Sequence, residues 1–305
     1  MDNAFATVEP TATAHESNVY DTEWWGVGDA IHVRVFVGKS VSKRPVLFLH
    51  GFGQTGASWE KTAVALAAAG YTSYCPDLRG HGHSQWRLDA DYSLDRLIED
   101  VDHMTVRIGE PPILVGASLG GLIAMLMAGE MKPCPFDQLI CVDITHTWDR
   151  SGVGRILQFM RAHPLGFDSL QHARDTIAAY LPHRPKGKGG SSLEKNLRQD
   201  EAGRWRWRWD PRMLEVVPAQ SDEFEARIGP ALGNLSVPLT LLQGEHSDVV
   251  NDEHVAELID KVPHARHYKI ADAAHMVAGD ANDLFTTTVL HEINADLTHR
   301  KVKLQ

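Results

Sequence analysis

A serine near the middle of the chain lies in a pattern typical of a catalytic nucleophile. Ser118 is the third residue of Gly116–Gly120, which reads Gly-Ala-Ser-Leu-Gly. The apolar run Ile113–Val115 before it has the length of a buried strand, and Leu119–Met131 after it is rich in helix formers. A strand that turns directly into a helix bends sharply and exposes the serine hydroxyl at its apex. The pattern therefore predicts a nucleophile at Ser118.

Four further motifs accompany this turn, and together they resemble one protein family. They are His50-Gly51-Phe52-Gly53, Asp77-Leu78-Arg79-Gly80-His81-Gly82-His83-Ser84, Gly244-Glu245-His246-Ser247-Asp248 and Ala274-His275-Met276. In this order they resemble the α/β-hydrolases, in particular the serine-nucleophile group of esterases, lactonases and carbon–carbon bond hydrolases. The resemblance covers about Val19 to Thr298. It implies an α/β fold with a mostly parallel, doubly wound sheet, an inserted helical cap, and catalysis without metal or organic cofactor.

The catalytic base is predicted from the position of a histidine late in the chain. A serine hydroxyl is too weakly acidic to attack an ester unaided, so a general base must lie within hydrogen-bond reach. In the resembled family the acid and then the histidine follow the serine. His275 comes just after Ala265–Ile270, the last predicted strand, where this base is expected. His264 and His267 lie before or within that strand and are interpreted as surface or packing residues.

Three carboxylates are candidates for the acid that orients His275. Asp248 follows the predicted strand Pro238–Gln243 and ranks first, because the resembled family usually places its acid there. Asp143 ranks second, since some relatives place the acid after the strand that precedes the cap. Glu245, three residues before Asp248, ranks third.

The loop after the apolar run Val46–Leu49 is expected to complete an oxyanion hole. The resemblance implies that the backbone N–H of Phe52 lies opposite that of Leu119, and two such donors would stabilise a tetrahedral oxyanion. His50 is expected to stiffen this loop through hydrogen bonds rather than to take part in the chemistry.

The histidine-rich segment Asp77–Ser84 raises the alternative of a metal site. Its histidines, taken together with His50, match no familiar metal spacing, and no cysteine or carboxylate ligands are obviously clustered with them. We interpret the segment as a glycine-rich turn in which Asp77 and Arg79 brace neighbouring loops.

The order of predicted elements indicates how the core is built. Strand-like and helix-like segments alternate from Val46 to Ile144, which indicates βαβ units and a parallel sheet. The alternation resumes at Pro238. We therefore expect a hydrolase core of residues 18–144 and 236–305.

The N-terminal part is expected to add a tail and a hairpin. Residues 1–17 are polar without periodicity, which predicts a flexible tail, and they lack the basic start and apolar run of a secretory signal. Val19–Trp25 and Ile31–Val37 flank a Gly-Val-Gly-Asp sequence, a signal for a β-hairpin.

Residues 145–235 interrupt the alternation and predict a helical cap. The glycine- and lysine-rich run Arg184–Ser192 is expected to be mobile and to gate substrate entry. Arg204–Pro211 alternates arginine with tryptophan, which we interpret as tryptophans packed inward and arginines paired with carboxylates, rather than as a nucleic-acid surface. The expected helices are Gly154–Ala162, Leu170–Tyr180 and Ser192–Ala202.

Composition narrows the classes of function. A net charge of −10 argues against non-specific binding of nucleic acid, and no window is apolar enough for a membrane span. Of three cysteines, Cys75 and Cys141 lie in apolar runs and are expected to be buried thiols of a reducing compartment. We expect a cytoplasmic protein, either monomeric or homodimeric, whose partner is a small molecule.

These observations predict hydrolysis of a carboxylic ester or lactone through an acyl-enzyme on Ser118. The substrate is expected to be apolar. Two alternatives on the same fold stay open: hydrolysis of a carbon–carbon bond in a diketone-like substrate, and a small-molecule receptor with little or no turnover.

Overall fold

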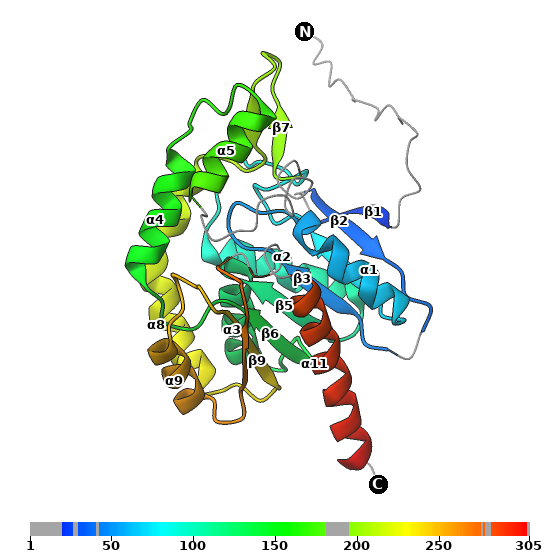
Figure 1. The fold of residues 1–305 in the computed structure, drawn as a ribbon. Helices are drawn as coiled ribbons and strands as arrows, with labels where there is room; N and C mark the ends of the chain where they lie inside the picture. Colours follow the sequence, from blue (N-terminus) through cyan, green and yellow to red (C-terminus); the bar gives the residue numbers. More distant parts are fainter. Residues whose placement is uncertain are drawn as a thin grey trace.

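In a computed structural model of the chain, the structure describes residues 20–26, 30–40, 43–180, 195–275, 277 and 282–303. Its centre is an eight-stranded sheet in the order β1-β2-β4-β3-β5-β6-β9-β10, with helices on both faces (Figure 1). The strands are β1 (Asp21–Trp25), β2 (Ile31–Phe36), β3 (Val46–Leu49), β4 (Ser73–Pro76), β5 (Ile113–Ala117), β6 (Gln138–Val142), β9 (Leu239–Gly244) and β10 (Arg266–Ile270).

The sheet is parallel from β4 to β10. Within this eight-stranded sheet the antiparallel pairs are β1 with β2 and β2 with β4, and β1 pairs with β2 as the sequence predicts. Its register aligns Leu49 with Gly116 and Val142 with Leu242, so the loops that follow β3, β5, β6 and β9 meet at one edge. The predicted fold class, a mostly parallel α/β sheet, is confirmed.

The core lies on both faces of this sheet because its central strands are apolar throughout. Successive residues point to opposite faces. Leu47 and Leu114 therefore pack with α2 (Leu94–Ile108) and α3 (Leu119–Glu130), whereas Phe48 and Val115 pack with α1 (Glu60–Ala68) and α11 (Asn282–Lys303). A strand covered on both faces needs a continuous apolar sequence, and for this reason the apolar runs could be recognised as strands from the sequence. The described core also contains the 3₁₀ helix η1 (Gly56–Trp59) and α9 (Asp252–Lys261).

Residues 145–235, called the insertion below, lie between β6 and β9. They contain α4 (Arg150–Arg161), α5 (Leu170–Tyr180), the antiparallel pair β7 (Leu197–Gln199) and β8 (Trp205–Trp207), α7 (Met213–Ala219) and α8 (Ser221–Leu232). Figure 1 shows α4, α5 and β7 to one side of the sheet. The first two predicted helices are confirmed. The third, Ser192–Ala202, is wrong, because the described part of that range forms a turn and β7.

Helix α8 packs on α3 of the core, and its first turns also meet the start of α4, where Arg150 pairs with Asp222 and Glu225. A Cβ added to Gly129 of α3 would lie 2.1 Å from the carbonyl oxygen of Ala231 in α8. That contact requires glycine, and Phe224 and Ile228 of α8 join the apolar cluster of the sheet. The last helix of the insertion is thus part of the core.

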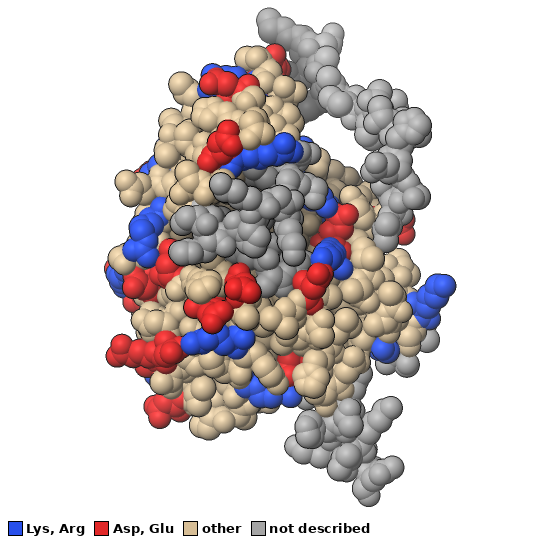
Figure 2. Space-filling view, in the orientation of Figure 1, with Lys and Arg blue, Asp and Glu red and all other residues tan. Residues whose placement is uncertain are grey.

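The arginine–tryptophan segment Arg204–Pro211 has most of the structure expected of it, although Arg208 donates to the carbonyl oxygen of Leu197 instead of a carboxylate. Alternate residues of a strand face opposite sides. The three tryptophans pack in apolar clusters with α4 and α5, while Arg204 and Arg206 pair with the carboxylates of Asp168 and Asp200. Across the face in Figure 2, acidic and basic side chains lie next to one another in the same way.

Three further expectations concern the cysteines, the two segments predicted to be flexible, and membrane-spanning helices. Cys75 and Cys141 are buried free thiols, as predicted, and burial raises the pKa of Cys141 to about 12. Residues 1–17 and Arg184–Ser192, predicted to be flexible, lie outside the described residues. Among the helices described, none combines the length and apolarity that crossing a lipid bilayer requires.

Candidate active site

Ser118 occupies the turn between β5 and α3, at the apex predicted from sequence. Its backbone has φ +46° and ψ −115°, a sparsely populated conformation of the kind found at active sites. The turn is tight because glycines permit close contact: a Cβ at Gly116 would lie 2.7 Å from the carbonyl carbon of Gly120, and one at Gly120 would lie 2.5 Å from Leu49 O. The Ser118 N–H donates to Val142 O at 3.1 Å, which fixes the turn to β6.

His275 lies after β10 and is hydrogen-bonded to a carboxylate that follows β6. Its Nδ1 is 2.8 Å from Oδ2 of Asp143, whose side chain is 0% exposed. An ionised carboxylate only accepts hydrogen bonds, so the proton is on Nδ1 and the basic lone pair of the neutral ring is on Nε2. This is the tautomer that a general base needs.

Asp143 is held by donors from the last residue of β9 and from the loop after it. The N–H of Gly244 donates to Oδ1 at 2.8 Å, and the hydroxyl of Ser247 donates to Oδ2 at 2.5 Å. With His275, three donors satisfy a carboxylate that is fully removed from solvent, which is what burial of a charge demands. Sequence reasoning missed the role of Ser247. The available signal was its place in the Gly-Glu-His-Ser-Asp motif.

The ranking of the acids is corrected by this geometry. Asp248 is 38% exposed, and its Oδ2 lies 3.4 Å from Nη2 of Arg155 in α4. Glu245 is exposed and accepts a hydrogen bond from the N–H of Asp272. The structure thus brings Asp143, and neither Asp248 nor Glu245, to His275. The physical reason is reach: Asp143 directly follows β6, beside the end of β9, whereas Asp248 lies four residues beyond β9 and extends toward α4.

Ser118 and His275 line the same cavity, which has a volume of about 670 Å³. Phe52, Leu119 and Asp248 also reach it. The insertion contributes mainly apolar side chains, among them Trp148, Ile156, Phe159, Met160, Trp207 and Trp209. The serine and the histidine–aspartate pair therefore face one largely apolar space between the sheet edge and the insertion.

A family model described as the alpha/beta hydrolase fold matches residues 44–281. The chain is an α/β-hydrolase. The esterase Rv0045c of Mycobacterium tuberculosis is 32% identical over 247 residues, which are 77% of this chain and 78% of the relative. The 3-hydroxybutyrate-oligomer hydrolase of Cupriavidus necator is 25% identical and covers 78% of this chain, with 84% of its own length matched.

Solved structures agree on the fold. A structure of Rv0045c, determined with a study of its transition metal inhibition, has a TM-score of 0.71 at 27% identity and covers 92% of this chain and 93% of its own. E-2-(acetamidomethylene)succinate hydrolase has a TM-score of 0.78 at 19% identity and covers 90% of this chain and 99% of its own. At that identity the second likeness shows the shared fold alone.

Two buried histidines, His50 and His81, brace the loop that follows β3. Each ring donates to a backbone carbonyl through Nδ1, while Nε2 of His50 accepts the N–H of Leu78 and Nε2 of His81 accepts that of Gly53. Burial lowers the pKa of His50 to about 4 and that of His81 to about 3, so both rings are neutral at pH 7. The expected stiffening role of His50 is confirmed. Their Nε2 lone pairs are occupied by peptide N–H groups, which argues against a metal site here.

Asp77 and Arg79 are braces, as predicted. Burial alone would raise the pKa of Asp77, but hydrogen bonding by His32 and the charge of Arg34, whose Nη1 lies 2.8 Å from Oδ1, hold it well below its usual range. Arg79 makes a two-pronged ion pair with Asp100 at 2.5 and 2.6 Å. These buried pairs fix the loops behind the cavity rather than facing it.

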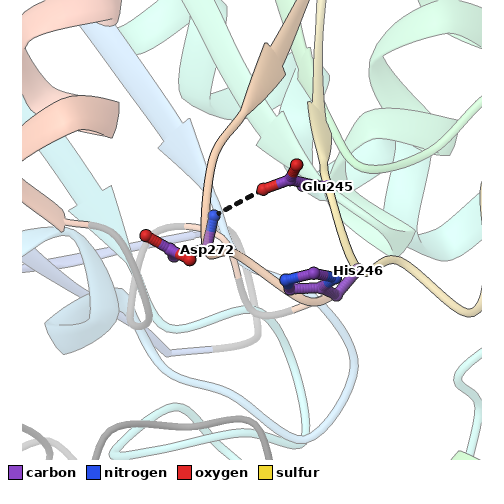
Figure 3. Close-up of side chains that lie close together, drawn as sticks. All are labelled: Glu245, His246 and Asp272. Carbon is purple, nitrogen blue, oxygen red and sulfur yellow. Dashed lines mark hydrogen bonds between the residues drawn. The ribbon is translucent and has the colours of Figure 1, made fainter.

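One group of described residues has ligand atoms within 4.8 Å of one another, and it lies beside the catalytic loops. Figure 3 shows Glu245 and His246, from the loop after β9, facing Asp272 from the loop after β10. All three are exposed, and Glu245 already accepts the N–H of Asp272 at 3.1 Å. Exposed groups of this kind are common without an ion, and we assign no metal to this one.

Proposed function

We propose that the protein is a serine hydrolase that cleaves an apolar carboxylic ester or lactone through an acyl-enzyme. The observation that carries the proposal is the 2.8 Å contact between His275 Nδ1 and Asp143 Oδ2, in a cavity that Ser118 also lines. The identity of 32% with an esterase supports the same reaction class.

In the proposed first half-reaction, Oγ of Ser118 attacks the carbonyl carbon while Nε2 of His275 takes the hydroxyl proton. Asp143 stabilises the imidazolium through its buried carboxylate. The tetrahedral intermediate then collapses, the carbon–oxygen bond to the alcohol breaks, and His275 returns the proton to the leaving alkoxide. A water molecule, activated by His275, attacks the acyl-enzyme in the second half and releases the acid.

The oxyanion is proposed to bind the backbone N–H groups of Phe52 and Leu119. Leu119 is the first residue of α3, where peptide N–H groups point out of the helix and carry its positive dipole. No described residue accepts a hydrogen bond from either N–H. Both are thus available to a ligand oxygen, and loss of one such donor costs about a hundred- to a thousandfold in rate.

The insertion is proposed to act as the cap that selects the acyl group. Its apolar side chains form most of one wall of the cavity, and Trp209 lies 5.8 Å, ring to ring, from Phe52. Met160 of α4 also packs on the loop after β3, where a Cβ added to Gly53 would lie 2.6 Å from its methyl carbon. An apolar acyl chain would bury surface against these residues, whereas a charged one would lose hydration there.

The test is Ser118→Ala assayed with aryl esters of increasing acyl length. We expect kcat/KM to fall by about 10⁴-fold or more with an unchanged circular dichroism spectrum. The wild-type enzyme should prefer apolar acyl groups. Undiminished turnover by Ser118→Ala would refute the nucleophile. Acylation without turnover in the wild type would favour the receptor alternative, and activity only on diketone-like substrates would favour carbon–carbon bond hydrolysis.

A further inference from the structure

The hydroxyl of Ser247 can donate its hydrogen bond in only one direction, toward the carboxylate of Asp143. Its Oγ accepts the peptide N–H groups of Val249 at 3.2 Å and Val250 at 3.0 Å. A hydroxyl has two acceptor lone pairs and one proton, so with both lone pairs engaged the proton is left for the remaining neighbour. That neighbour is Oδ2 of Asp143, at 2.5 Å.

The same carboxylate oxygen receives the histidine. Oδ2 of Asp143 accepts both the Ser247 hydroxyl and Nδ1 of His275, while Oδ1 accepts the Gly244 N–H. Rotation of the carboxylate would break one of these contacts, and the group is closed off from water that could replace it. The loop in which the family resemblance placed the acid thus supplies a hydroxyl donor to an acid that follows the neighbouring strand.

We propose that Ser247 is a positioning residue for the triad, which fixes the Asp143 carboxylate in the plane and place that His275 requires. This inference rests on the proposed function. Ser247 acts through Asp143 and does not contact the reacting atoms. Its hydroxyl is expected to matter to the chemical step and not to substrate binding.

Ser247→Ala tests this proposal. The variant leaves one oxygen of a buried carboxylate short of a donor, and loss of a hydrogen bond to a charged group corresponds to about a ten- to hundredfold fall in kcat. KM should stay within about twofold. Ser247→Cys, which keeps the shape but is a weak donor, should show a comparable loss and serves as the second variant if alanine prevents folding.

Ser151→Ala is the matched control. The Ser151 hydroxyl also donates to an aspartate, Oδ1 of Asp149, at 2.6 Å, but on the exposed first turn of α4. We expect its kcat to equal that of the wild type. A loss shared by both serine variants would point to a general effect of hydroxyl removal and would overturn the proposal.

A double-mutant cycle separates positioning from mere structural support. In an Asp143→Asn background, whose residual acylation is followed with an activated aryl ester, Ser247→Ala should cost no further activity, because the group it positions is gone. An additive loss, or a wild-type kcat for Ser247→Ala, would overturn the inference. The proposed function is tested separately by Ser118→Ala. If that variant is inactive, the proposed function stands whatever the result for Ser247, whereas an active Ser118→Ala would overturn both the proposed function and the role of Ser247.

Discussion

The two sides of the cavity hold their charged groups in opposite ways. On the sheet side, ionisable groups such as Asp143 and Asp77 are buried and hydrogen-bonded from several directions. On the insertion side, α4 presents exposed pairs: Arg155 is 53% exposed where it meets Asp248. Buried, fully satisfied polar groups fix geometry, whereas exposed pairs contribute little energy. In the proposed mechanism the sheet side therefore supplies the chemistry, and the insertion side contacts the substrate.

The largest expected effect is the difference in kcat between variants of Asp143 and Asp248. In Asp143→Asn an amide replaces the acceptor that holds the Nδ1–H tautomer of His275, and such a change costs about 10³–10⁴-fold in kcat. Asp248→Asn removes one member of an exposed pair, so kcat should change by less than about fivefold. Steady-state kinetics on an aryl ester measure both. Comparable losses in the two variants would mean that the buried and exposed carboxylates do not differ in role.

The ambiguity between these aspartates shows where sequence reasoning ended. The turn at Ser118 and the position of His275 could be predicted, because the first is a short pattern between an apolar strand and a helix, and the second lies in the loop after the last strand. Asp143 and Asp248 follow neighbouring parallel strands, and which one meets the histidine depends on tertiary contacts made by Gly244 and Ser247. No local pattern encodes such contacts.

Only some helices of the insertion could be predicted from the sequence, for a related reason. Helices α4 and α5 were recognised from their own sequences, but α7 and α8 were not, since each contains an internal proline, Pro218 or Pro230, that reads as a break. The strands β7 and β8 have only three residues each, and β7, in which Leu197 alone is buried, carries little periodicity. Their stability comes from tertiary contacts, for instance between Phe167 and Trp207, whose ring centroids lie 5.4 Å apart.

The buried histidines make the sheet side sensitive to pH. The pKa of His50 is lowered to about 4 and that of His81 to about 3, while the unfolded chain titrates near 6.5. As pH falls below 6.5 the unfolded chain binds protons that the folded protein excludes, so the free energy of unfolding should fall until pH reaches the folded values. Each histidine contributes a slope of up to about 1.4 kcal/mol per pH unit.

Urea unfolding between pH 7.5 and pH 4.5 measures this slope. In His81→Gln we expect a shallower dependence, whatever its stability at pH 7.5, because one buried site no longer takes part. His103→Gln, at an exposed position of α2, is the matched control and should keep the wild-type slope. An equal slope in all three proteins would assign the pH dependence to groups outside the braced loops.

Removal of the exposed pair itself should have the smallest effect. Arg155 lies 3.4 Å from Asp248 and 3.2 Å from the Ser151 hydroxyl, both in contact with solvent. Arg155→Ala should lower the free energy of unfolding by less than about 1 kcal/mol, since solvent screens the charges. The backbone contact beneath it remains, because Gly152 lets α4 lie against the carbonyl of Asp248. Thermal unfolding together with kcat decides the point: a tenfold loss of kcat would show that the exposed pair also sets the catalytic geometry, and the division between the two sides would fail.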